Sequence, residues 1–183
     1  MLKVNFKTSY YLQSKIICVP YEREKLIDFL SNLEKLFLQH KDYLIDAIAK
    51  ESGIVWPIKE LDVFLFEGWQ PSVSSPLLLN TYNYDLDFCF FNLVHELIHN
   101  NIMQVPIKDE KGNWNHVELE AIVNAILLRV LQPIFSKKQL DDFSFFAEFG
   151  GLYKYVWIRT REILSELKNN NISFAQWFGE LYG

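Results

Sequence analysis

The sequence predicts an α+β fold with a small, mostly antiparallel sheet near the N-terminus and a helical C-terminal part. Two observations lead to this prediction. Short runs rich in β-branched, aromatic or alternating residues, bounded by Gly, Pro and Ser, are confined to the first half of the chain. After them, apolar residues recur at intervals of three and four up to the C-terminus. The 183 residues, half of them apolar, suit one domain with a sizeable core.

Residues 1–60 are predicted to form short strands and a helical cap. LKVNF alternates between apolar and polar side chains, and YYLQSKIICV, residues 10–19, ends at Pro20. From Tyr21 onward, apolar residues follow helical spacing. A second helical stretch, KDYLIDAIAKE, ends before Gly53. We therefore expect two helices in this part, and we expect them to cover the domain.

The segment that follows, residues 61–131, is predicted to hold the sheet and the helices of a functional site. LDVFLFEGW, residues 61–69, and PLLLNTY, residues 76–82, are strand candidates on either side of a Pro/Ser-rich turn. A helix then starts near Asp85 or Asp87, because either carboxylate suits a helix N-terminus.

Helices fill the chain after the charged loop VPIKDEKGNWN. One helix extends from about Asn115 to about Leu131, ahead of Pro133. Ser173 and Gln176 have the spacing of a capping box, which marks the start of the last helix. Residues 132–183 thus form the helical C-terminal part of the single domain, with helices over about 137–148, 151–168 and 173–182.

Charge, hydropathy and cysteine content exclude several classes of protein. The net charge of −5 and the pI of about 5.4 leave no basic patch suited to nucleic acid. No stretch of about 18 apolar residues is free of charge, so we expect no membrane span, and we find no signal peptide. Two cysteines, Cys18 and Cys89, are too few for a disulfide framework. We expect a cytoplasmic protein, and the sequence leaves its oligomeric state open.

The helix that contains FFNLVHELIHNNIM, residues 90–103, combines an apolar surface with a stripe of polar groups. Side chains three and four positions apart share a helix face, so His95, Glu96 and His99 lie on one side. Two imidazoles one turn apart can converge on one metal ion, and Glu96 beside them can reach a water on that ion. HELIH therefore predicts a zinc site, and a pair of hydrogen-bonded core histidines is the alternative.

A zinc site of this kind needs a third protein ligand. Glu118 and Glu120 on the helix NHVELEAIVNAILL point in different directions, because two positions lie about 200° apart around a helix. Asn115 and Glu118 have capping-box spacing, which gives Glu118 a role at the helix start. We therefore predict Glu120 as the third ligand. Asn124, one turn later, either holds the far nitrogen of a ligating histidine or is an ordinary helix amide.

HELIH at 95–99 and EAIVN at 120–124 resemble the gluzincin branch of zinc metallopeptidases, the thermolysin-like group. The short spacing between these motifs and the small size of the chain resemble the minimal forms called minigluzincins. The resemblance covers about Leu61 to Leu131, and it implies a zincin-like fold in which the sheet packs on the HExxH helix. The metzincin branch needs a Gly-x-x-His after His99, whereas this chain continues NNIMQVP.

The resemblance implies a zinc-dependent peptidase that hydrolyses a peptide or protein substrate. His95, His99 and Glu120 would bind Zn²⁺, and Glu96 would act as general base and then as general acid. In this family a peptide pairs with the edge of the sheet before the motif helix. That strand would be Pro76–Tyr82 here, and a simple buried strand is the alternative for this segment.

Active gluzincins also carry a His or Tyr that contacts the oxyanion of the substrate, and this residue is not defined by the motifs. His116 lies one turn before Glu120, and it either faces the cleft or lies in water at the helix start. Tyr153 shares the helix GGLYKYVWIRTREIL with Tyr155 and Arg159, and it is either this residue or part of the core. A catalytically silent or latent zinc-binding domain, acting in regulation or protein interaction, is therefore the alternative function. A metal-free helical interaction protein is the third reading.

Overall fold

The structure is a computed structural model, and it describes residues 2–8, 23–66, 72–74, 76–81, 84–108, 111–146 and 151–182. The chain divides into two compact units. Unit 1 comprises Met1–Ile45 and Trp56–Asn100, and unit 2 comprises Asp46–Val55 and Asn101–Gly183. The strand predicted at residues 10–19 lies outside the described residues.

The sheet of unit 1 is mostly parallel. Across the sheet, the described strands follow the order β1 (Lys3–Thr8), β2 (Glu60–Phe66), β4 (Leu77–Asn80) and β3 (Val73–Ser74). β1 pairs with β2, and β2 with β4, in parallel, whereas the two-residue β3 pairs antiparallel with β4. The prediction of a mostly antiparallel sheet is therefore wrong, and the chain is mostly helical.

The direction of the strands follows from the connections between them. The helix α2 (Arg23–Ser52) lies between β1 and β2 in the chain, and Lys3 at the start of β1 pairs with Glu60 at the start of β2. Parallel neighbours need a long connection of this kind, which is usually helical. Alternating side chains identify a strand, but they carry no information about the direction of its partner. This is why the sequence pattern missed the parallel pairing.

The same strand order corrects the predicted peptide-binding edge. The strand predicted at Pro76–Tyr82 corresponds to β4, which has a partner on each side. Tyr82 itself lies outside the described residues. Among the residues that the structure describes, β3 forms the edge of the sheet on this side. The interpretation of Pro76–Tyr82 as an edge strand is therefore wrong, and β4 instead fits the alternative of a buried strand, because Leu77, Leu79 and Asn80 are buried.

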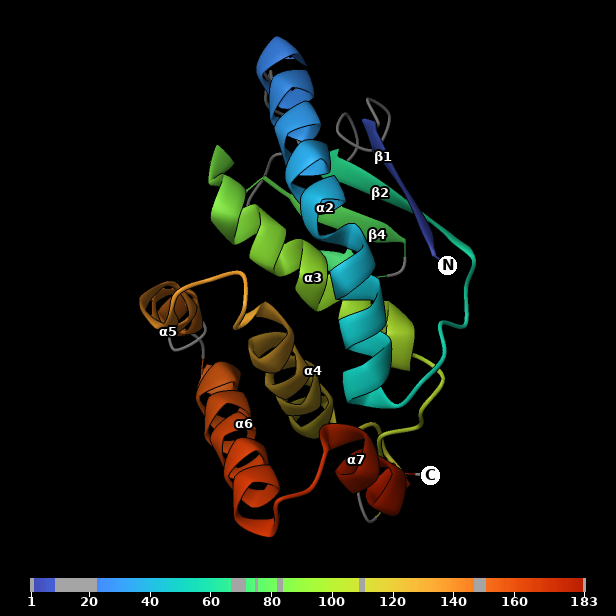
Figure 1. The fold of residues 1–183 in the computed structure, drawn as a ribbon, viewed down its shortest axis with the longest axis vertical. Helices are drawn as coiled ribbons and strands as arrows, with labels where there is room; N and C mark the ends of the chain where they lie inside the picture. Colours follow the sequence, from blue (N-terminus) through green and yellow to red (C-terminus); the bar gives the residue numbers. More distant parts are fainter. Residues whose placement is uncertain are drawn as a thin grey trace. The chain divides into compact units, whose positions relative to one another are not determined.

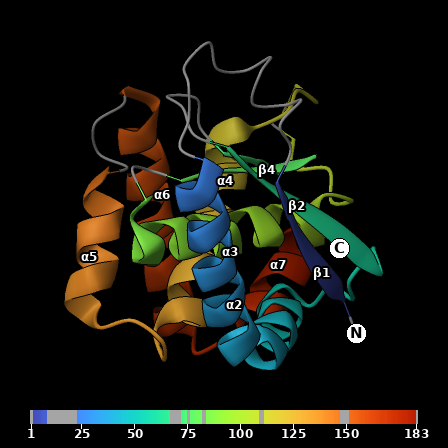
Figure 2. The same cartoon turned by 90° about the horizontal axis from the view of Figure 1, so that it is seen from above.

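Two helices lie on the same face of the sheet, α2 and α3 (Leu86–Ile102), as Figures 1 and 2 show. The rings of Phe6 in β1 and Phe37 in α2 pack with centroids 5.6 Å apart. On the other face of β1 and β2, Asn5 donates hydrogen bonds to both Glu60 and Asp62, and the ammonium group of Lys7 lies over the ring of Phe64. The buried residues on the face toward the helices are Val63, Leu65, Leu77 and Leu79.

α2 is one continuous helix where two were predicted. Neither Gly nor Pro interrupts residues 23–52, so nothing breaks the helical spacing at the junction of the two predicted helices. The helix ends at Ser52, and the next residue, Gly53, has a φ of +73° and donates its N–H in a hydrogen bond of 2.9 Å to the carbonyl oxygen of Ala49. Glycine is favoured at this left-handed position after a helix.

Unit 2 is helical. After the end of α3 it contains α4 (His116–Leu131), α5 (Lys137–Phe146), α6 (Gly151–Asn170) and α7 (Phe174–Tyr182), close to the predicted ranges. α4 packs against α6, and the two run side by side in Figure 1. At the start of α7, the hydroxyl of Ser173 accepts a hydrogen bond of 3.1 Å from the N–H of Gln176. None of the described helices is long and apolar enough to cross a membrane.

Candidate metal centre

α3 holds the two histidines of HELIH on a helix that is mostly buried from Cys89 to Ile102. It begins after Asp85, whose side chain accepts a hydrogen bond of 2.9 Å from the backbone N–H of Phe88. This is the capping bond that a carboxylate at this position was predicted to make. His95 and His99 are partly exposed and Glu96 is buried, whereas the apolar side chains Leu93, Val94, Leu97 and Ile98 are fully buried. The packed helix therefore provides a rigid support for its polar stripe.

The imidazole rings of His95 and His99 converge. Their Nε2 atoms lie 3.1 Å apart, and their ring centroids lie 4.8 Å apart. Zinc–nitrogen bonds of about 2.0–2.1 Å place two ligands of a tetrahedral ion about 3.3 Å apart. The two nitrogen atoms are within hydrogen-bond distance of each other, and their separation also suits two ligands of one ion.

The start of α4 gives Glu118 a structural role. The side-chain oxygen of Asn115 accepts a hydrogen bond of 3.1 Å from the N–H of Glu118. The carboxylate of Glu118 accepts two hydrogen bonds from Arg159, of 2.8 Å from Nε and 3.1 Å from Nη2. The hydroxyl of Tyr182 donates to the same carboxylate at 3.3 Å. Glu118 is therefore engaged with α6 and α7.

His95, His99 and Glu120 form a group that can hold a metal ion. One ligand atom from each side chain takes part, and these atoms all lie within 4.8 Å of one another. Each of the three residues is partly exposed. Two imidazoles and one carboxylate are the protein ligands of one class of catalytic zinc site, which keeps a further position open. The chemistry of this donor set fits zinc.

Asn100 connects the motif helix to the edge of the sheet. Its side chain is 5% exposed, and its amide nitrogen donates hydrogen bonds of 2.9 Å to the carbonyl oxygens of Ser74 and Glu96. Ser74 belongs to β3, and Glu96 lies one turn before Asn100 on α3. Asn100 also lines a cavity of about 520 Å³ with Ser74, Pro76 and residues of β1 and β2. Asn100 therefore fixes β3 relative to the helix that carries His95 and His99.

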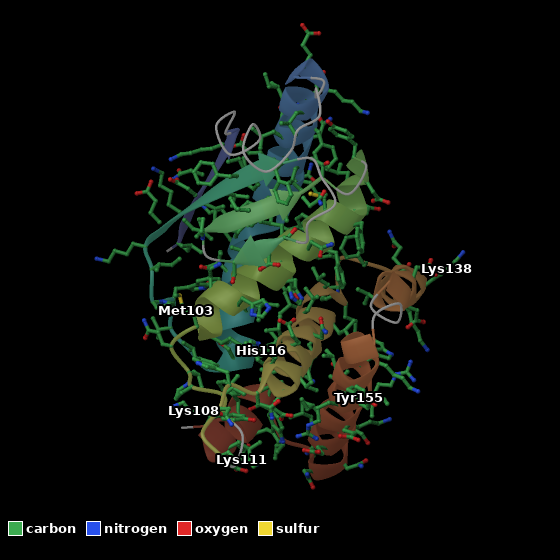
Figure 3. The ribbon with its side chains drawn as sticks, turned by 180° about the vertical axis from the view of Figure 1, so that it is seen from behind. Met103, Lys108, Lys111, His116, Lys138 and Tyr155 are labelled. Carbon is green, nitrogen blue, oxygen red and sulfur yellow. The ribbon has the colours of Figure 1, made fainter. Side chains whose placement is uncertain are left out.

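The remaining predicted site residues are His116, Asn124 and Tyr153. His116 is exposed on the first turn of α4, as Figure 3 shows, one turn before Glu120. Asn124 is partly exposed one turn after Glu120. Tyr153 belongs to α6, but its side chain lies outside the described residues. Tyr155 on the same helix is 63% exposed, so it is not part of the core.

Two polar residues of unit 2, Asn101 and Arg159, make contacts that the sequence did not predict. Asn101 is fully buried, accepts a hydrogen bond of 2.6 Å from the hydroxyl of Ser52, and donates to the carbonyl oxygen of Ile54. An amide inside an apolar helix is the sequence signal that could have identified it. Arg159 binds Glu118 from a position 41 residues away, and this hydrogen bond raises the pKa of its guanidinium. No local sequence pattern shows that pair.

Comparison of the chain with protein-family models, with curated proteins and with solved structures finds no match.

Proposed function

We propose that the protein is a zinc-dependent peptidase of the gluzincin type. The observation that carries this proposal is that ligand atoms of His95, His99 and Glu120 all lie within 4.8 Å of one another. Glu96 supports it, because HELIH places this carboxylate beside the two imidazoles without making it a ligand. A hydrogen-bonded pair of core histidines would not require a carboxylate from a different helix.

Each residue of the group has a distinct role in the proposal. His95, His99 and Glu120 hold the ion, and Asn124 orients a ligating histidine through its far nitrogen. Bound zinc would lower the pKa of a water molecule and polarise the scissile carbonyl group. Glu96, which is 7% exposed, takes a proton from the attacking water and passes it to the leaving amine.

The substrate in this proposal is a peptide or protein chain. An extended chain can pair through its main chain with an open sheet edge, and β3 provides that edge in place of Pro76–Tyr82. His116 contacts the substrate carbonyl from the face of α4 that it shares with Glu120, and Tyr153 is the other candidate. The cytoplasmic setting predicted from the two cysteines belongs to the same proposal.

Metal analysis tests the ligand set. Protein purified without added metal is expected to contain stoichiometric zinc, and His99→Ala and Glu120→Ala are expected to lose it. His116→Ala is the matched control, because it removes an imidazole one turn from Glu120 and is expected to keep the zinc. Zinc-free parent protein that also binds no added zinc would contradict the metal centre.

Cleavage of a peptide library tests the reaction. Glu96→Gln is expected to keep its zinc and to lose cleavage, because the amide cannot accept the proton of the water. Cleavage by Glu96→Gln at the parent rate would exclude the assigned role of Glu96. Zinc binding without cleavage by the parent would instead favour the latent or regulatory zinc-binding domain.

A further inference from the structure

Arg159 is the centre of a polar network in unit 2. Besides its two hydrogen bonds to Glu118, its Nη1 donates to Glu162 at 3.2 Å and to Glu166 at 3.0 Å. Its side chain is 26% exposed, and that of Glu118 is 14% exposed. A guanidinium that binds a carboxylate through two nitrogens fixes both the distance and the orientation of that carboxylate. The contact between Arg159 and Glu118 therefore fixes both the spacing and the orientation of α6 and α4 at this point.

A neighbouring residue of α6 makes a further contact with α4. The hydroxyl of Thr160, which is fully buried, lies 3.4 Å from the carbonyl oxygen of Ala121 and 2.9 Å from that of Val156. Arg159 and Thr160 thus contact α4 at residues 118 and 121. These two positions flank Glu120.

The C-terminal helix supports the same network. The hydroxyl of Tyr182 donates to Glu118, and the indole nitrogen of Trp177 donates to Glu166 at 3.0 Å. Both acceptors are carboxylates that Arg159 also binds. α7 therefore restrains two of the three carboxylates that bind the guanidinium.

We infer that Arg159 is a positioning residue for the metal ligand Glu120, an inference that rests on the proposed metal centre. Each residue of an α-helix turns the chain by about 100°, so Glu118 and Glu120 point about 200° apart. A bond that holds Glu118 toward α6 therefore sets the rotation of this turn of α4 and directs Glu120 away from α6. Loss of that bond lets the turn rotate and fray, and the carboxylate of Glu120 then spends less time in the position of a ligand.

The test is the zinc and cobalt affinity of folded variants, measured by competition with a chromophoric chelator. Arg159→Met keeps the length of the side chain and removes its donors, and Glu118→Gln removes the charge of the partner. Each is expected to weaken metal binding by about 10-fold or more, the usual effect of removing a group that orients a ligand. Arg159→Lys is expected to fall between parent and Arg159→Met, because an ammonium cannot make the two-nitrogen contact.

Arg129→Met is the matched control. Arg129 lies on α4 beyond Glu120 and binds Glu51 through Nε at 2.6 Å and Nη2 at 3.3 Å, so its loss removes a similar ion pair from the same helix. The control is expected to keep the parent affinity and the parent cobalt absorption spectrum. A purely structural role for Arg159 predicts lower unfolding free energy with unchanged affinity and spectrum in the folded variants.

The outcomes separate this inference from the proposed function. Parent affinity in folded Arg159→Met or Glu118→Gln would overturn the positioning role and leave the metal centre intact. Failure of the parent to bind zinc or cobalt would overturn both. In the double variant, the two losses are expected not to add, because both substitutions break one contact. Additive losses would show that Arg159 does not act through Glu118. Glu118→Gln keeps the test available if Arg159→Met does not fold.

Discussion

The side-chain oxygen of Asn115 accepts a hydrogen bond of 3.1 Å from the backbone N–H of Glu118. This bond caps α4 and satisfies one of the N–H groups that have no partner within the helix. The spacing of Asn115 and Glu118 predicted a cap here, which is why Glu118 was assigned to the helix start and Glu120 to the metal site. The Glu118 carboxylate binds Arg159, and Glu120 belongs to the group that can hold a metal ion.

Asn115→Ala is expected to lower the free energy of unfolding by about 0.5–2 kcal/mol, because alanine cannot accept the capping bond. Urea denaturation followed by circular dichroism measures the change. Asn115→Asp, which keeps an acceptor at the same place, is expected to stay close to the parent. Equal stability of Asn115→Ala and the parent would show that the cap contributes nothing.

Asn100→Ala is expected to speed amide hydrogen exchange in residues 72–81. The substitution removes the hydrogen bond from Asn100 to Ser74, and β3 pairs with β4 over just two residues. Exchange followed by mass spectrometry measures the effect. Asn92→Ala is the control, because the Asn92 amide donates within α3 to Phe88, and exchange at residues 72–81 should remain unchanged. Equal exchange in both variants would contradict a tether role for Asn100.

The sequence predicted features that depend on neighbouring residues. The N-terminal caps at Asp85, Asn115 and Ser173 form through side chains that bond an N–H three residues later, so local spacing identified them. The spacing of His95 and His99 within one helix is equally local. These signals placed the helix starts and indicated which side chains could share a metal.

Features set by distant segments were missed or wrong. Strand direction depends on how α2 connects β1 to β2, which no alternation of side chains reports. The break predicted within α2 was instead a local error, because no Gly or Pro interrupts residues 23–52. The network around Arg159 joins residues of α4, α6 and α7, and such a network becomes visible only when the three helices are placed.

Gly53→Ala is expected to lower the free energy of unfolding by about 1–2 kcal/mol. Its φ of +73° lies in the left-handed region, which is unfavourable for residues with a Cβ atom. An added Cβ would also lie 3.0 Å from the Cβ of Ala175. Gly179→Ala is the contrasting control, because Gly179 lies inside α7 with open space around an added Cβ, and it should raise stability by about 0.5–1 kcal/mol. Thermal denaturation of both variants checks the opposite signs.

Tyr182 is expected to make stability fall with rising pH in the alkaline range. Burial, then the negative charge of Glu118 and the hydrogen bond to it, raise the pKa of the Tyr182 hydroxyl to about 12 from its ordinary value of 10.0. The unfolded chain releases this proton near pH 10, whereas the folded chain keeps it to about pH 12. The stabilising contribution of Tyr182 is therefore complete below about pH 10, and it is lost as the pH rises to about 12. The measurement is the difference in unfolding free energy between the parent and Tyr182→Phe, which cancels the ionisation of other residues. This difference should decrease over that interval, and a constant difference would show that the folded chain does not raise the pKa of Tyr182.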